Sequence, residues 1–509
     1  MTMIDRRGFL FGAMTVIAAG AGEFRLGFAQ AAAKGGAKGA DVTPFITITP
    51  DNRIVIHSPN AEMGQGAATG HAQILAEELD ADWNLVSVDL APLGEAYKNP
   101  AFKRQATGGS TSIRAWYPEL RRMGAAAREM LKSAAAAEWS VPAGEIATEN
   151  STLVHKGSGR KATYGEMAGA AAKQKLPDDP PLKDEKDFRI IGEPLRRPDT
   201  PAKVDGSLVY GIDLKLDGML VAAVHMPPVF GARVKDYDVN GADKIPGVRG
   251  IHRIASGVAV VADGYWPARK ALEQMTFTYD GPAEKLSSAD IDARLRELLD
   301  AGEGVSATVR GDARKRIEGA KGGKVISRDY DAPFLAHATM QPITGAARFT
   351  KDGLEIWTSS QSPGTAAARA AEITGLSPDR ITVHQMFLGG GFGRGAVPSA
   401  DIQAVELAAI TKRPVKVIWS REDDIAHDYY RPTAKARLRA LLAADGKPEA
   451  VHVLVAAPSL AQGVGLPERD GYDPFSVEGL SDFPYAVPAL EVTYARAETP
   501  VPLGFWRSV

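Results

Sequence analysis

Met63-Gly64-Gln65-Gly66 and, far later in the chain, Gly389-Gly390-Gly391-Phe392-Gly393-Arg394-Gly395 are the two stretches that decide how this protein is organised. Each follows a strand-like segment and leads into a run of small residues. Glycine lacks a Cβ, so such loops bring backbone N–H groups close to a ligand. A third loop, Thr107-Gly108-Gly109-Ser110, adds to the pattern. Together the loops predict a site for a large bound cofactor.

The two stretches occupy equivalent places in a repeated order of elements. Hairpin, glutamine-containing loop, helix, strand and glycine loop follow one another twice, and Ser359-Ser360-Gln361 is the second glutamine loop. The predicted elements are a hairpin over 45–57, a helix over 67–80 and a strand over 85–90, and then a hairpin over 347–357, a helix over 366–373 and a strand over 381–387. We expect two related halves around one site, although any mixed α/β sequence can offer such a coincidence.

Composition changes along the chain suggest where its parts begin and end. A long Ala-rich helix is expected over 118–139. The stretch rich in Pro, Lys and Asp is predicted as a linker, and the short strands after it as a separate inserted domain. The expected parts are a first cofactor-binding part over 45–177, a linker over 178–202, an inserted domain over 203–285 and a second cofactor-binding part over 286–509.

The N-terminus has the layout of an export signal. Arg6-Arg7 precedes an apolar stretch over 9–21, and Ala29-Gln30-Ala31 matches a small-x-small cleavage site. Paired arginines indicate the twin-arginine route, which exports folded proteins. We therefore expect a signal peptide over 1–31, a flexible linker over 32–44 and a periplasmic protein. A stop-anchor helix and an unstructured N-terminus are the alternatives.

Composition excludes several classes of site. The formal net charge of −2 leaves no broad basic field for nucleic acid, and no later stretch is long and apolar enough for a stable membrane span. The absence of cysteine excludes disulfides, a cysteine-ligated iron–sulfur cluster and a thiolate zinc site in this chain. Nine histidines remain without an HExxH motif, so no metal site built from side chains is predicted.

The motifs, taken together, match a known family. They are Glu62 to Gly66, Thr107 to Ser110, Lys203-Val204-Asp205-Gly206 with Tyr210, His337 to Pro342, Gly389 to Arg394, and Trp419 to Asp423. With them the chain resembles the molybdopterin-binding large subunit of the xanthine dehydrogenase and aldehyde oxidase superfamily. It is most similar to the isoquinoline 1-oxidoreductase beta-subunit branch, in which the MGQG segment comes first.

The resemblance implies both a fold and a function. The fold would be multidomain α+β, with two related cofactor-binding parts and an inserted α/β hammerhead-type domain. The function would be that of a molybdenum-dependent hydroxylase subunit that oxidises an N-heterocyclic or aldehyde substrate with oxygen from water. The cofactor would be molybdopterin cytosine dinucleotide. Electrons would pass to a small [2Fe–2S] partner subunit, with a cytochrome c as a further candidate partner.

The resemblance also implies which residues contact the cofactor. Gln65 and Gly66 would contact the pterin, and Gln361 would lie near the oxo ligand of the metal. Arg507 matches an arginine near the substrate pocket and is counted with the site. The remaining predicted contacts are Gly108, Gly109, Ser110 and Thr111 at the pterin or phosphate region, and Gly390, Gly391, Phe392 and Gly393 at the molybdenum end.

No catalytic residue is assigned. The family's catalytic glutamate has no counterpart here, because the sequence stops at Gly504-Phe505-Trp506-Arg507-Ser508-Val509. We therefore expect a C-terminally incomplete chain, and a non-catalytic truncated or split half is the first alternative. A flavin or nicotinamide oxidoreductase is the second, since Gly391 to Ala396 fits G-x-G-x-x-A. Against it, no acidic residue ends a strand about twenty residues on.

Several motif residues have interpretations that need no ligand. We expect His71 and His337 to be packed, and Glu62 to bind loop N–H groups rather than to act as a base. Trp419 to Asp423 is interpreted as a structural turn, because adjacent side chains on a strand point to opposite faces. Arg394 is left open between a phosphate contact and a solvated loop.

Overall fold

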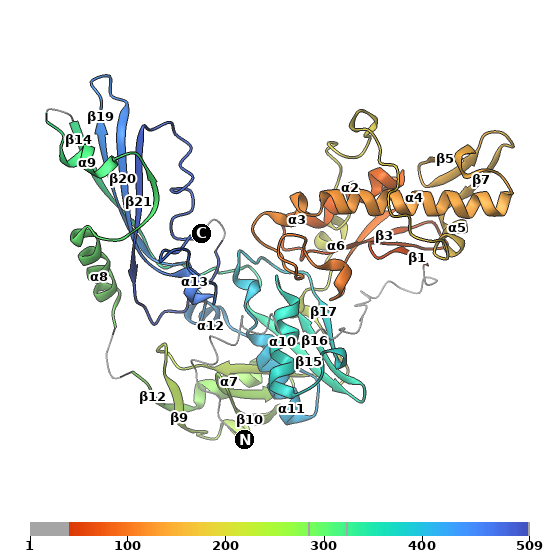
Figure 1. The fold of residues 1–509 in the computed structure, drawn as a ribbon. Helices are drawn as coiled ribbons and strands as arrows, with labels where there is room; N and C mark the ends of the chain where they lie inside the picture. Colours follow the sequence, from red (N-terminus) through yellow and green to blue (C-terminus); the bar gives the residue numbers. More distant parts are fainter. Residues whose placement is uncertain (1–39, 283–285, 322–323, 507–509) are drawn as a thin grey trace.

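A computed structural model describes residues 40–282, 286–321 and 324–506. Figure 1 shows three parts: an N-terminal part at the upper right, a seven-stranded sheet with its helices below, and a five-stranded sheet at the upper left. The predicted signal peptide over 1–31, most of the predicted linker over 32–44 and Arg507 lie outside the described residues. None of the helices in the described ranges is both long and apolar enough to cross a bilayer.

The N-terminal part is a four-stranded sheet packed against two helices (Figure 1). β2 pairs antiparallel with β1 and β3, and β3 pairs parallel with β4. A three-stranded sheet and a short helix complete the part. Its elements are β1 (Ala40–Thr43), β2 (Ile46–Ile48), β3 (Ile54–Ser58), α2 (Ala67–Leu79), β4 (Val86–Leu90), α3 (Thr111–Arg114), α4 (Tyr117–Trp139), β5 (Ile146–Glu149), β6 (Thr152–His155), β7 (Arg160–Thr163) and α5 (Tyr164–Ala171).

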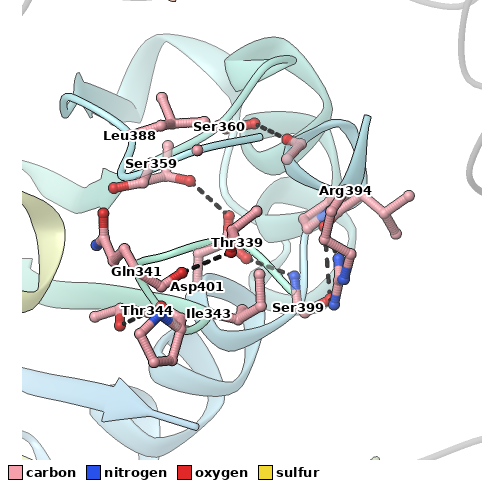
Figure 2. A pocket seen from close by; sticks show the side chains of 16 residues that line it. Thr339, Gln341, Ile343, Thr344, Ser359, Ser360, Leu388, Arg394, Ser399 and Asp401 are labelled. Carbon is pink, nitrogen blue, oxygen red and sulfur yellow. Dashed lines mark hydrogen bonds between the residues drawn. The ribbon is translucent and has the colours of Figure 1, made fainter. Parts of the chain in front are cut away.

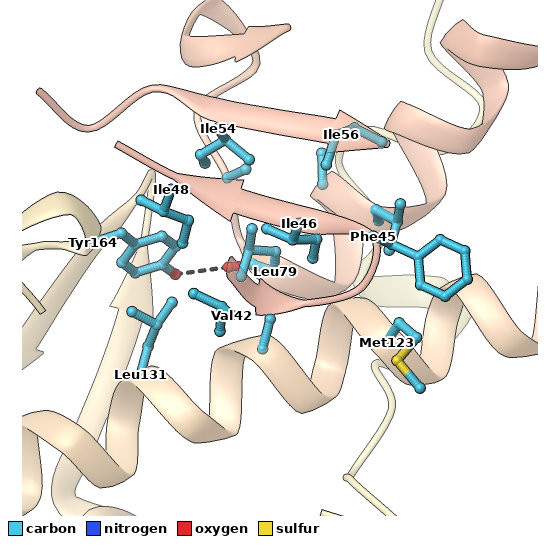
Figure 3. Packing of buried hydrophobic residues seen from close by; sticks show 14 of the residues in the cluster. Val42, Phe45, Ile46, Ile48, Ile54, Ile56, Leu79, Met123, Leu131 and Tyr164 are labelled. Carbon is cyan, nitrogen blue, oxygen red and sulfur yellow. Dashed lines mark hydrogen bonds between the residues drawn. The ribbon is translucent and has the colours of Figure 1, made fainter. Parts of the chain in front are cut away.

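Alternating isoleucines form the core of this part. Because side chains on a strand alternate between its two faces, Ile46 and Ile48 point into one layer, where Ile54 and Ile56 of the next strand join them. Figure 3 shows these side chains packed over α4. The Tyr164 hydroxyl donates to the Leu79 carbonyl at 2.7 Å, which satisfies the polar end of a fully buried ring.

Residues 178–202 differ from the predicted linker because two buried carboxylates of α2 bind part of this stretch. Glu77 accepts the N–H groups of Arg189 at 2.8 Å and Ile190 at 2.6 Å, and Glu78 accepts that of Lys183 at 3.0 Å. Since an unpaired buried carboxylate is costly, these bonds attach the stretch to the first core. The stretch then leads into α6 (Thr200–Val204).

The seven-stranded sheet crosses a predicted domain boundary. Its strand order is β10-β11-β8-β18-β15-β16-β17, and β8 pairs parallel with β18. Strands of the block 203–285 therefore share one sheet with strands of the second half, and the boundary falls inside a sheet. The elements are β8 (Leu220–His225), β10 (Val248–Ile254), β11 (Gly257–Ala262), β15 (Thr344–Thr350), β16 (Gly353–Thr358), β17 (Ile381–Gln385) and β18 (Val415–Ile418).

Helices and a two-stranded ribbon accompany this sheet. α10 and α11 pack against one layer of its core, and α7 packs against the strands of the earlier block (Figure 1). The elements are β9 (Arg233–Asp238), α7 (Tyr265–Gln274), β12 (Thr276–Asp280), α10 (Pro363–Thr374), α11 (Ala400–Thr411) and α12 (Arg421–Ala426).

The five-stranded sheet was not anticipated from the sequence. Its order is β13-β21-β20-β19-β14, so it joins strands from residues 305–332 with strands from 434–497. The predicted part over 286–509 is therefore divided between two sheets. The elements are α8 (Ser288–Ala301), β13 (Val305–Arg310), α9 (Ala313–Glu318), β14 (Lys324–Ala332), β19 (Ala434–Leu442), β20 (Pro448–Pro458), α13 (Leu460–Gly463) and β21 (Ala489–Ala497).

The predicted repeat of elements is confirmed at the level of strand pairing. β2 and β3 form an antiparallel pair, α2 follows, and β4 returns parallel to β3. β15 and β16 form an antiparallel pair, α10 follows, and β17 returns parallel to β16. Each half thus places a glutamine loop before its helix and a glycine loop after its last strand.

Gly124 allows α4 to cross α2 at close range. A Cβ at this position would lie 2.6 Å from the Leu75 carbonyl oxygen. We predict that Gly124→Ala destabilises the protein by about 1–3 kcal/mol, the usual cost of overpacking. Gly169→Ala in α5 is the matched control, because no atom lies within 4 Å of its Cβ. Alanine there should stabilise by up to about 1 kcal/mol. Denaturant unfolding that gave both variants the same sign would contradict this account.

His71 on α2 makes folding sensitive to acid. Burial lowers its pKa to about 4, from an ordinary value of 6.5. Below pH 6.5 the unfolded chain takes up a proton that the folded chain does not, so stability falls as the pH falls toward 4. The loss at the lower end should be about 3 kcal/mol. In His71→Gln this part of the pH dependence should disappear, and equal slopes for the two proteins in unfolding titrations would refute the assignment.

Candidate functional site

Gln361 joins the glycine loops of the two halves. Its backbone N–H donates to the Gly395 carbonyl at 2.8 Å, and its carbonyl accepts the Thr107 N–H at 2.8 Å. Its side-chain Oε1 accepts the Gly393 N–H at 3.0 Å, while Nε2 donates to the Thr107 carbonyl at 3.0 Å. This buried residue therefore fixes the Thr107 loop and the Gly389–Gly395 loop relative to each other.

Glycine is required where these loops meet. A Cβ on Gly391 would lie 2.5 Å from Met63 Sδ and 2.7 Å from Gln361 Oε1. A Cβ on Gly393 would lie 1.8 Å from the Phe505 carbonyl oxygen, and its φ of 113° is one that side chains rarely allow. The first and last parts of the described chain therefore both reach the Gly389–Gly395 loop.

The Met63–Gly66 loop is organised around the Glu62 carboxylate. Buried Glu62 accepts the N–H groups of Gly64 at 2.9 Å, Gly66 at 3.2 Å and Ala68 at 3.2 Å. Arg197 lies 3.0 Å from the same carboxylate. The interpretation of Glu62 as a partner for loop N–H groups is confirmed. These amides are consequently occupied within the protein.

Gln65 is an exposed residue of this loop, as is Gly64. Its Nε2 donates to the Ala61 carbonyl at 2.8 Å, and its Oε1 accepts the Met63 N–H at 2.8 Å. Gly66 adopts φ 83° where α2 begins. The loop therefore presents the Gln65 side chain, rather than the N–H of Gly66, to its surroundings.

The Thr107–Thr111 loop holds two successive left-handed residues, Gly109 at φ 55° and Ser110 at φ 52°. The Arg114 guanidinium binds their carbonyls, at 3.0 Å from Gly109 and 3.1 Å from Ser110. The buried Thr111 hydroxyl donates to the Gly108 carbonyl at 2.8 Å. Arg114 thus holds the loop by its carbonyl oxygens, while the N–H groups of Gly108, Gly109 and Ser110 have no acceptor among the described residues.

Six backbone N–H groups of the glycine loops have no acceptor among the described residues. Three belong to each loop, and successive free N–H groups of this kind form a concavity suited to anions and electronegative groups. This arrangement fits a large cofactor that carries phosphate. The six groups are those of Gly108, Gly109, Ser110, Gly390, Gly391 and Phe392.

Apolar side chains lie exposed around these loops. Phe392 stands at φ 56° in the Gly389–Gly395 loop, and Met340 is 89% exposed. Phe102 lies against Gly109, where its ring would be 3.2 Å from an added Cβ. Exposed large apolar residues gathered at one place usually mark a binding surface.

A small cavity lies behind the Gly389–Gly395 loop (Figure 2). Its volume is about 40 Å³, which suits ordered water rather than a substrate. Gln341, Ser359 and Ser399 are among its lining residues. Buried Asp401 lines it too, and burial raises the pKa of that carboxyl above its ordinary value. We therefore assign no substrate to this cavity and regard its lining residues as support for the Gly389–Gly395 loop.

Arg394 fits neither interpretation that the sequence left open, a phosphate contact or a solvated loop residue. It is 1% exposed, and its Nε lies 2.9 Å from the Asp428 carboxylate. Its guanidinium also donates to the Val397 carbonyl at 3.0 Å and to the Ser399 hydroxyl at 2.9 Å. It is neither a solvated residue nor free for a phosphate, because all these groups are inside the protein.

The Trp419–Asp423 segment begins a helix instead of forming a simple turn. The Ser420 hydroxyl accepts the Asp423 N–H at 3.1 Å, and Asp423 accepts the Ser420 N–H at 3.0 Å, which is a capping box. Arg421 donates to the carbonyls of Thr339 and Met340, the latter at 3.0 Å. The segment therefore has a structural role, as expected, but it forms the N-terminus of α12 rather than a turn.

Neither a free base nor a metal-ligand cluster is evident in the described ranges at these loops. Glu62, Asp401 and Asp428 each accept hydrogen bonds from backbone N–H groups. His71 and His337 are buried and hydrogen bonded, as expected. No group of three or more His, Asp or Glu residues there could hold a metal ion. We therefore assign no catalytic residue.

Two family models match the chain, and both are described as a molybdopterin cofactor-binding domain. One matches residues 15–214 and the other residues 300–502. The Met63–Gly66 and Thr107–Thr111 loops lie in the first match, and Gln361 and the Gly389–Gly395 loop lie in the second. The loops that meet at Gln361 therefore come from two matched domains.

Curated relatives extend over nearly the whole chain. The chain is 32% identical to isoquinoline 1-oxidoreductase subunit beta of Brevundimonas diminuta, over 90% of this chain and 64% of that protein. It is 30% identical to a membrane-bound aldehyde dehydrogenase (pyrroloquinoline-quinone) of Gluconacetobacter polyoxogenes, over 99% of this chain and 68% of that protein. The chain thus spans about two thirds of the length of these relatives.

A solved structure shares the fold. The aldehyde oxidoreductase of Desulfovibrio gigas matches with a TM-score of 0.51 and 17% identity, over 90% of this chain and 50% of that one. At this identity the match concerns the fold alone. It agrees with the predicted multidomain α+β architecture.

Sequence reasoning missed the groups that support the loops. Arg197 was assigned to a linker, yet its guanidinium bonds the Gly64 carbonyl at 3.2 Å and the Glu62 carboxylate. Asp428 was not singled out, although it binds both His337 and Arg394. Neither residue belongs to a motif with characteristic spacing, so nothing in the sequence marked them.

We predict that Gln361→Leu destabilises the protein by about 2–4 kcal/mol, because it leaves the Gly393 N–H and the Thr107 carbonyl without their buried partner. Gln274→Leu is the matched control, since Gln274 is exposed and its side chain makes no hydrogen bond among the described residues. That control should stay within about 0.5 kcal/mol of wild type. Equal shifts of the two denaturation midpoints would contradict the role given to Gln361.

Proposed function

The chain belongs to the molybdopterin cofactor-binding family, and from this premise we propose that it is the cofactor-holding part of a hydroxylase. The substrate would be an N-heterocycle or an aldehyde, with the added oxygen taken from water. The observation that carries the proposal is the meeting of glycine loops from both matched domains at Gln361, with six N–H groups free of partners in the described chain.

The residues present fit a large phosphate-bearing cofactor. The N–H groups of Gly108 to Ser110 would receive its anionic part, and those of Gly390 to Phe392 would face its other end. Gln361 would hold both loops at a fixed separation, so that little ordering entropy is lost when the cofactor binds. When bound, the molybdenum cofactor would supply the two-electron redox chemistry, while the protein binds and orients the reactants.

The surroundings of the loops support an apolar or aromatic substrate. Phe392 and Met340 expose apolar surface beside the Gly389–Gly395 loop. Such surface binds flat apolar rings and excludes water from the reacting groups. The names of two relatives, an isoquinoline oxidoreductase and an aldehyde dehydrogenase, agree with these two substrate classes.

Four finer features belong to the same proposal. The cofactor would be the cytosine dinucleotide form, and electrons would leave through a small [2Fe–2S] subunit, because this chain contains no cysteine to bind such a cluster. A cytochrome c would be a further acceptor. Paired Arg6-Arg7 supports export by the twin-arginine route to the periplasm.

The strand order argues against the flavin or nicotinamide alternative. Among the described strands, β17, which precedes the Gly391–Ala396 segment, is the edge strand of its sheet and pairs with β16 alone. A dinucleotide fold places its glycine loop after a strand inside the sheet, where the strand order reverses. The alternative of a non-catalytic half is decided by turnover, once cofactor binding has been measured.

We predict that the chain, co-expressed with a candidate small subunit, copurifies with molybdenum and a releasable pterin nucleotide in near-stoichiometric amounts. Gly391→Ala should lower the bound molybdenum by about tenfold or more, because the new Cβ would displace Met63 Sδ and Gln361 Oε1. Elemental analysis and nucleotide release measure both quantities.

Gly364→Ala is the control for this experiment. Gly364 lies in α10. The Cβ of an alanine at this position would make only an ordinary contact of 3.7 Å with Leu93. This variant should keep wild-type molybdenum. A folded wild-type chain without molybdenum, or equal loss in both variants, would refute the proposal.

A further inference from the structure

His337 is a buried residue that connects two segments far apart in the sequence. Its backbone N–H donates to the Asp428 carboxylate at 2.6 Å, and its Nδ1 lies 2.9 Å from the same carboxylate. Its Nε2 lies 2.8 Å from the carbonyl oxygen of Phe505. The ring therefore bridges the segment just after α12 and the segment that reaches the Gly389–Gly395 loop.

Both ring nitrogens of His337 face oxygen atoms that can only accept. A neutral imidazole has a single N–H and could donate to one of them only. Asp428 binds the residue at both its backbone N–H and its Nδ1, so it holds the ring with Nε2 toward the Phe505 carbonyl.

Asp428 is itself held in place. Arg394 Nε lies 2.9 Å from its carboxylate, and the Tyr429 N–H donates to it at 2.7 Å. The Arg394 guanidinium is stacked near the rings of Trp419, at 5.6 Å, and Tyr429, at 5.3 Å. Because Asp428 and Arg394 are both 1% exposed, solvent does not weaken these interactions.

The segment that His337 binds is closely fitted to the loop. Gly504 donates its N–H to the Tyr430 carbonyl at 3.1 Å, and an added Cβ would lie 2.8 Å from that of Tyr429. The Phe505 carbonyl sits against Gly393, whose N–H is bound by Gln361. The position of Phe505 is therefore coupled to the residue that joins the two halves.

Aromatic side chains of this segment form a wall beside the loop. Phe505 packs edge-on against Phe475, with ring centroids 5.2 Å apart, and the Trp506 ring lies 6.3 Å from that of His337. The buried indole N–H of Trp506 has no hydrogen-bond partner in the described ranges. The wall thus combines apolar rings with one buried indole N–H.

We propose that His337, oriented by Asp428, is a positioning residue that fixes the segment Leu503–Trp506 against the Gly389–Gly395 loop and so sets one wall of the substrate site. The inference rests on the proposed function, because the wall serves a substrate only if the loop holds the cofactor. His337 and Asp428 act through this segment and are given no catalytic role.

Hydrogen exchange tests the contact in the full chain. The Gly504 N–H should exchange about tenfold faster or more in His337→Gln and in Asp428→Asn, while β16 and β17 keep wild-type exchange. His384→Gln is the matched control, because His384 is also buried and bonded to a carboxylate, that of Glu355 at 3.2 Å. Unchanged exchange at Gly504, or a rise in the control as well, would overturn the proposal.

Kinetics of the molybdenum-loaded complex test the link to substrate, with isoquinoline and benzaldehyde as probes. His337→Gln should raise KM about tenfold at unchanged molybdenum content, with kcat within about threefold, as expected when only binding is lost. An effect on kcat alone, or none, would overturn the role in the substrate site. If the wild-type chain binds no molybdenum while Gly504 exchange still rises in the variants, the proposed function fails and the contact itself stands.

Discussion

One buried amide, that of Gln361, is the interaction on which the rest of the site depends. A glutamine side chain offers both a donor and an acceptor, and this one uses each for a different loop. Its backbone groups bond the same two loops. Since an unpaired buried polar group costs about 1–3 kcal/mol, the two domains cannot separate at this point without a large loss. A cofactor that needs groups from both domains therefore meets a preformed site.

Buried carboxylates serve as the second means of connection. Glu62 organises the Met63–Gly66 loop, and Glu77 and Glu78 bind the stretch that leads to the central sheet. Each is satisfied by backbone N–H groups and by arginine or lysine. A charge inside a protein is tolerated only under such conditions, and loss of one partner typically costs about 3–5 kcal/mol. These carboxylates thus fix where the chain runs as it leaves the N-terminal part.

The elements with clear periodicity were predictable. The hairpin predicted over 45–57 corresponds to β2 and β3, and the helix predicted over 67–80 corresponds to α2, which the structure places over Ala67–Leu79. Sheet partners were not predictable in the same way. The block 203–285 reads as a domain of its own, yet β8 pairs with β18. The backbone N–H and C=O groups of a strand can be satisfied by any strand that lies beside it. The residues of one strand therefore do not indicate which distant strand will be its partner.

The sequence by itself determined the glycine loops, their repeated context and the resemblance to molybdopterin-binding subunits, because close backbone approach requires glycine at particular positions. Only the tertiary structure decided what those loops touch. It placed Gln361 between them, turned the Gly64 and Gly66 amides toward Glu62, and buried Arg394 against Asp428. Hydrogen-bond partners brought together from distant segments depend on the folded path of the whole chain, and a local pattern of residue types contains no information about that path.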